Sequence, residues 1–113
     1  MVTSLLLVAA ILSTPNCCYV TGNQLHRGAI SAQKVHERHA TQDDLDEANK
    51  FLGYVQGSVD ALSSSGRICL TGNPTIGQII EVVTDYMDTH PDEWEKSGAV
   101  VVQDALARRY VCK

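Results

Sequence analysis

Apolar residues between positions 42 and 63 recur at the period of an α-helix. They step by three or four residues at a time along one face: Leu45, Ala48, Leu52, Val55, Val59 and Leu62. Thr41 with Asp44 three residues later is an acidic version of the capping box that opens a helix. The loop-forming run Ser63-Ser64-Ser65-Gly66 follows. The pattern therefore predicts a long helix over 42–63.

Two glycines interrupt this helix pattern. Gly53 and Gly57 lie about one turn apart, and each costs about 1 kcal/mol relative to alanine inside a helix. Their presence indicates that a neighbouring backbone approaches this helix closely.

A second helix is predicted after the turn residues 71–74. Thr75 and Gln78 form another capping box, and the apolar stripe continues through Ile76, Ile79, Ile80, Val83 and Met87. His90 should end the helix, because the residue before a proline is pushed out of helical geometry.

A third helix is expected to begin at Pro91 and to continue to about Tyr110, with Gly98 as a small interruption. Residues 23–40 are less legible and predict a short first helix anchored by Ile30 and Val35. No segment of sufficient length alternates apolar and polar residues as a β-strand would. The expected fold is all-α, a small bundle of about four helices with one disulfide.

The beginning of the chain differs from the rest, because the first 26 residues carry none of its 22 charged side chains. The apolar run Leu5–Leu12 would span about 12 Å as a helix, which is too short for the ~30 Å core of a bilayer. It fits the apolar region of a secretory signal. We therefore expect a signal peptide over residues 1–18, with cleavage between residues 18 and 22, and one domain over 19–113. The alternative is a buried N-terminal element of a cytosolic protein.

Export changes the cysteine count. Cleavage after Cys18 removes Cys17 and Cys18 and leaves Cys69 and Cys112, which in an oxidising compartment most simply form one disulfide. If Cys18 is retained, the pairing stays open. The chain has no Cys-x-x-Cys pair, which argues against a zinc site.

Charge and composition exclude several classes of function. The 113 residues carry a formal net charge of −4, and the only adjacent basic pair is Arg108-Arg109, so the chain lacks the cationic face that nucleic acid binding needs. His36 and His39 could share a helical face, but no third metal ligand is evident, so both are interpreted as surface residues.

Candidate chemistry is equally sparse. The serines before Gly66 lack a Gly-x-Ser-x-Gly elbow and a positioned base. An acidic cluster is interpreted as helix capping and a solvated face, because it lacks calcium-loop spacing: Asp85, Asp88, Asp92, Glu93 and Glu95. We expect no catalytic site, no metal and no cofactor, and hence a binding protein.

Several motifs in their order resemble the Rap/Tai immunity proteins, which are associated with type VI secretion amidase effectors. The opening block is Thr21-Gly22-Asn23-Gln24-Leu25, and the central block Leu52–Leu62 carries Gly-Tyr-x-x-Gly-x-x-Asp-Ala-Leu. Further matches follow in family order: Cys69-Leu70, Thr75-Ile76-Gly77-Gln78, Val82-Val83, His90-Pro91, Ala105-Leu106 and Cys112. The resemblance covers about residues 21–113. The chain departs from the family where Phe51 and residues 26–30 stand in place of cysteines.

The resemblance implies a small helical periplasmic protein that binds and inhibits a cognate peptidoglycan amidase. Family members are commonly homodimers, and a loop projecting from the helical body blocks the catalytic cleft of the effector. The matching segment in this sequence consists of Ser63, Ser64, Ser65, Gly66 and Arg67.

A small periplasmic acid-stress chaperone is the alternative. Such proteins are also helical with one disulfide, and they expose apolar surface in acid. Four histidines and thirteen carboxylates would supply the titratable groups.

Overall fold

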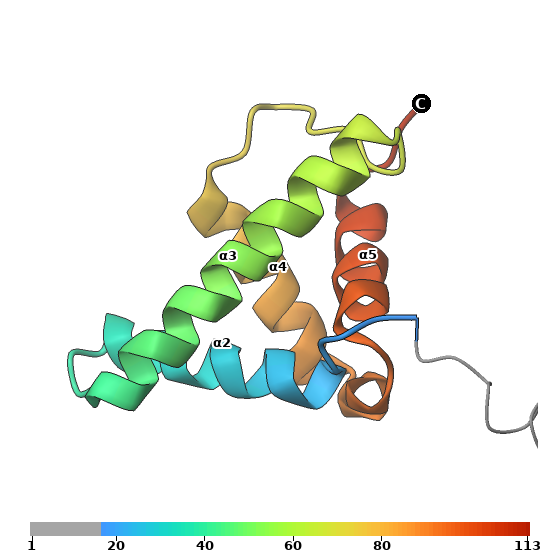
Figure 1. The fold of residues 1–113 in the computed structure, drawn as a ribbon. Helices are drawn as coiled ribbons and strands as arrows, with labels where there is room; N and C mark the ends of the chain where they lie inside the picture. The colour runs from blue at the N-terminus through green and yellow to red at the C-terminus, as the bar shows by residue number, and fades with distance from the viewer. Residues whose placement is uncertain (1–16) are drawn as a thin grey trace, which may run out of the picture.

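The computed structural model describes residues 17–113 and confirms the all-α class (Figure 1). Its elements are, in chain order, α2 Gly22–His36, α3 Gln42–Ser64, α4 Ile76–Thr89, the short 3₁₀ helix η1 Pro91–Glu95 and α5 Gly98–Arg109. The described residues form no β-strand, only an isolated antiparallel bridge between Thr21 and Ser97. The predicted apolar leader lies outside the described residues. None of the described helices is long and apolar enough to cross a membrane.

Three of the helices begin with a complete capping box. In each, a threonine side chain accepts a hydrogen bond from the backbone of the residue three positions on, whose own side chain accepts one from the threonine backbone. The pairs are Thr21–Gln24, Thr41–Asp44 and Thr75–Gln78. The second and third confirm the sequence prediction, and the first opens the helix that the sequence marked least clearly.

All of the helices and the segment after α3 contribute to one apolar core. Its fully buried side chains are Val55 from α3, Val83 and Met87 from α4, Val101, Val102 and Leu106 from α5, and Ile68 from the loop after α3. In Figure 1, α2 and α5 flank α4, and α3 runs across the face of the bundle. In α2 the anchors are Leu25 and Ala29. The predicted anchor Ile30 is instead 45% exposed, because it lies about 100° around the helix from Ala29, away from the core.

The glycines that allow close helix packing lie in α2. A Cβ on Gly28 would lie 2.7 Å from Cβ of Phe51 in α3, and one on Gly22 would lie 2.6 Å from the carbonyl oxygen of Trp94. The prediction for Gly53 and Gly57 is wrong: both are exposed, and a Cβ on either would meet nothing within 4 Å. These two glycines face away from the neighbouring helices.

The predicted third helix is divided in two. Pro91 opens the 3₁₀ helix η1, and α5 starts anew at Gly98 with Ser97 as its N-cap. The reason lies far away in the sequence. The Gly98 amide donates to the Val20 carbonyl at 2.7 Å, and the Gly22 amide donates to the Lys96 carbonyl at 2.7 Å. These bonds tie the chain before α2 to the break.

Two disulfides lie within the described residues. Cys69 and Cys112 are bonded across 43 positions, as predicted, and join the loop after α3 to the C-terminus. The adjacent residues Cys17 and Cys18 are also bonded to each other.

Candidate functional site

The segment Ser63–Arg67 lies at the C-terminal end of α3, next to the C-terminus of the chain (Figure 1). Ser63 and Ser64 still belong to the last helical turn, Ser65 is the C-cap, and only Gly66 and Arg67 lie beyond the helix. The part that leaves the helix is therefore shorter than the predicted loop, and its side chains are exposed.

Backbone hydrogen bonds fix the shape of this turn. Gly66 has φ +73°, and its amide donates to the Ser63 carbonyl at 3.1 Å, while the Arg67 amide donates to the Leu62 carbonyl at 2.9 Å. This pair of bonds is the Schellman motif, which needs a left-handed residue at the position that Gly66 occupies. The segment is consequently a defined turn rather than an open loop.

Two of the three serine hydroxyls of the segment bond back to the helix, while the Ser63 hydroxyl oxygen is buried without a hydrogen-bond partner. Ser64 Oγ donates to the Ala61 carbonyl at 3.1 Å and Ser65 Oγ donates to the Leu62 carbonyl at 3.2 Å. The exposed Arg67 makes no ion pair with any described residue. Arg67 is thus the exposed, unpaired charged side chain of this turn.

The base of the turn is anchored on both sides. Ile68 is buried in the core directly after Arg67, and the Cys69 amide donates to the Tyr110 carbonyl at 3.0 Å. The disulfide follows, with Cys112 Sγ 3.6 Å from the Gly66 carbonyl oxygen. The same bridge that the sequence predicts therefore supports the candidate segment.

The chain after Cys69 borders a polar hollow of about 350 Å³. Gly72 and Asn73 form its turn in left-handed conformations. Glu81 and Asp85 of α4 and Arg109 at the end of α5 contribute its charges.

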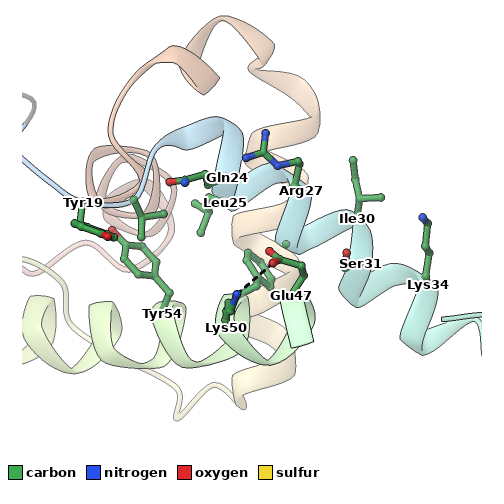
Figure 2. Close-up of a pocket in the computed structure, with 13 residues that line it drawn as sticks. Tyr19, Gln24, Leu25, Arg27, Ile30, Ser31, Lys34, Glu47, Lys50 and Tyr54 are labelled. Atoms are coloured by element: carbon green, nitrogen blue, oxygen red, sulfur yellow. Dashed lines mark hydrogen bonds and ion pairs between the residues drawn. The ribbon is translucent and has the colours of Figure 1, made fainter. Parts of the chain in front are cut away.

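A larger cleft of about 730 Å³ lies between α2, the first half of α3 and the chain that leads into α2 (Figure 2). Core residues Leu25 and Phe51 form its apolar floor. Tyr54 stands at one side of the cleft near Tyr19, and burial raises the pKa of the Tyr54 phenol. The polar lining residues come from both helices: Gln24, Arg27, Ser31, Lys34, Glu47 and Lys50.

A cluster of titratable groups joins α4 to η1. The buried Glu93 accepts a hydrogen bond from the Tyr86 hydroxyl at 2.9 Å and pairs with Lys96, with Nζ 2.6 Å from Oε2. Lys96 and then Tyr86 hold the pKa of Glu93 below its usual value, whereas burial and the bond to Glu93 raise the pKa of Tyr86 to about 12. Glu93 therefore departs from the predicted solvated acidic face, because it is buried and pairs with the exposed Lys96.

These groups satisfy one another, and the arrangement is that of a structural link between two elements. His90 adds to it as the C-cap of α4, with its ring stacked on Tyr86 at 4.0 Å between centroids. Within residues 17–113, no three His, Cys, Asp or Glu side chains come together as a metal site.

Comparison with known protein families matches residues 21–112 to the Rap1a immunity proteins. The chain belongs to this family. The protein is therefore an immunity protein, and this class of protein acts against a secreted effector. Comparisons with curated proteins and with solved structures gave no match.

The family match begins at Thr21, the N-cap of α2, and ends at Cys112 in the disulfide. It therefore encloses the whole helical body of the immunity protein and the complete Ser63–Arg67 segment. Sequence reasoning missed the cleft entirely, since its walls come from residues 19–34 and 47–54, which only the packing of α2 on α3 brings together. The sequence shows Arg27, Lys34 and Lys50, but nothing near any of them in the sequence indicates that they line the same cleft.

Proposed function

We propose that this immunity protein binds a secreted peptidoglycan amidase in the periplasm and inhibits it without chemistry of its own. Membership of the Rap1a family over residues 21–112 is the observation that carries the proposal. The resemblance to Rap/Tai proteins names the amidase as the effector class, and the uncharged leader supports export.

In this proposal the Ser63–Arg67 turn enters the catalytic cleft of the amidase. Three features of the turn support it: the exposure of residues 64–67, a backbone fixed by the Schellman bonds, and anchoring by Ile68 and the disulfide. A turn that is already ordered loses less conformational freedom on binding than a flexible loop, which favours affinity. Arg67 supplies a cation that can pair with an acidic group at the cleft mouth.

The test uses the purified immunity protein and the amidase encoded beside its gene. A stable complex in size-exclusion chromatography and loss of peptidoglycan cleavage are expected. Arg67→Glu should weaken inhibition, whereas Arg38→Glu makes the same charge change at an exposed residue beyond the opposite end of α3 and should not. The absence of a complex would refute the proposed function. Equal inhibition by both variants would refute the role of Arg67.

Light scattering of the free protein tests the homodimer that the resemblance implies. The acid-stress chaperone hypothesis makes a different prediction, because it requires protection of client proteins at pH ~2–3 and not at pH 7. Protection of that kind, without amidase binding, would favour the chaperone.

A further inference from the structure

The cleft between α2 and α3 has a charge opposite to that of the protein. Arg27, Lys34 and Lys50 line it against the single carboxylate of Glu47, so the lining carries a formal charge of +2, whereas the whole chain carries −4. A local reversal of sign attracts ligands of the opposite charge.

Most of these charges already have partners within the fold. Lys50 Nζ lies 3.3 Å from Oε1 of Glu47, and Lys34 Nζ lies 3.8 Å from Oδ1 of Asp44. Arg27 has no ion-pair partner among the described residues. Its guanidinium stands on the rim in Figure 2 and is the cation that an anionic ligand would meet.

Apolar side chains without a cover lie around the same cleft. Tyr19 is 99% exposed and Ile30 is 45% exposed, and both line it together with the half-buried Tyr54. Tyrosine and arginine are the residue types that most often dominate binding energy in protein interfaces. A half-open cleft with an apolar floor and this rim fits an acidic peptide segment that carries an apolar side chain.

A second copy of this chain fits the cleft less well. In a two-fold symmetric interface the same surface meets itself, so two positive linings would face each other across the contact. Charge complementarity therefore favours a different, acidic partner.

We propose that the cleft is a second docking surface for the amidase, taking an acidic segment whose carboxylate pairs with Arg27 and whose apolar side chain covers the floor. This inference rests on the proposed function. Lys50 at the cleft and Ser64 at the turn are about 21 Å apart along α3, at 1.5 Å per residue. One standard interface, with about 800 Å² on each partner, is large enough to include both.

The first test measures amidase binding by Arg27→Glu, with Arg38→Glu as the matched charge reversal outside both the cleft and the turn, and thermal unfolding as the check on folding. Arg27→Glu should bind about tenfold more weakly, mainly through slower association, and should lose part of the salt dependence that the wild type shows. Arg27→Gln, which removes the charge without reversing it, should show a smaller effect in the same direction. Equal affinity of Arg27→Glu and Arg38→Glu for the amidase would overturn the inference and leave the proposed function intact.

A second test needs no amidase. A fluorescein-labelled peptide of alternating glutamate and phenylalanine should bind the wild-type protein, and its lysine–phenylalanine counterpart should not. Ile30→Glu and Arg27→Glu should each abolish binding of the acidic peptide, with nuclear magnetic resonance shifts confined to the cleft residues in the wild type. Failure of the acidic peptide to bind would overturn the chemistry proposed for the cleft. If instead the free protein is a dimer that Arg27→Glu dissociates, the cleft belongs to a second copy and the inference is wrong.

Discussion

Removal of the Cys69–Cys112 disulfide should destabilise the protein more than any other change to its cysteines. The bridge closes a loop of 44 residues, counted from a separation of 43 positions. The chain-entropy relation for that length gives about 4 kcal/mol at 25 °C. Small domains are stable by about 5–15 kcal/mol in total, so this loss is a large fraction.

The measurement is urea unfolding of Cys69→Ser/Cys112→Ser, followed by circular dichroism under non-reducing conditions. At about 4–8 °C for each kcal/mol in a domain of this size, the midpoint of thermal unfolding should fall by roughly 16–32 °C. The matched control is Cys17→Ser/Cys18→Ser, with both double variants made in the uncleaved chain that retains Cys17 and Cys18. It also removes one disulfide, but one between adjacent residues that encloses no intervening chain.

The loss of stability should also reach the candidate segment, because Cys112 Sγ lies 3.6 Å from the Gly66 carbonyl. Amide hydrogen exchange at Gly66 and Arg67 should therefore accelerate in the double variant. A change in unfolding free energy below about 1 kcal/mol, well under the typical effect of about 2–4 kcal/mol, would refute the entropic reasoning. So would an equal loss in the control.

Four further substitutions test the backbone positions of three glycines and the pH dependence that Tyr86 confers. Gly57→Ala, at an exposed helical site where an added Cβ meets nothing within 4 Å, should raise the unfolding free energy by up to about 1 kcal/mol. Gly66→Ala, at φ +73°, should lower the unfolding free energy by about 1–2 kcal/mol. Effects of the same sign for both variants in urea titrations would contradict these expectations. Gly28→Ala should cost about 1–3 kcal/mol by overpacking against Phe51, and an unchanged urea midpoint would refute the close approach. Since the pKa of Tyr86 is raised from 10 to about 12, its contribution to stability is complete below pH 10 and should be lost as the pH rises towards 12. Tyr86→Phe should lack this alkaline loss in unfolding titrations, and an identical pH profile would count against the shift.

Sequence reasoning worked where the signal was local. The boxes at Thr41 and Thr75 depend on residues three positions apart, so both helix starts could be predicted. The roles of the glycines could not, since Gly28 and Gly57 look alike in a helical pattern and differ only in what packs against them. Pro91 suited a helix start, but the break before Gly98 depends on a bond to Val20 from the other end of the domain.

Separation along the sequence also limits how much of the candidate site could be predicted. The Ser63–Arg67 turn was visible because the serines and Gly66 signal the end of a helix. The cleft could not be predicted, because Arg27 and Lys50 come from different helices and the residues around one give no indication of the other. Only the packing of Gly28 on Phe51 defines how close the two walls lie.

The bridge between Thr21 and Ser97 bears on the order in which the fold can be completed. It joins the entry of the first described helix to the entry of the last, across 76 positions. The Gly22 and Gly98 amides find their acceptors there only when both ends are present. A chain that emerges from its N-terminus cannot close this junction until residue 98 is available, nor the disulfide until Cys112. This junction and the disulfide can therefore form only at the end of synthesis, after the helices between them have been made.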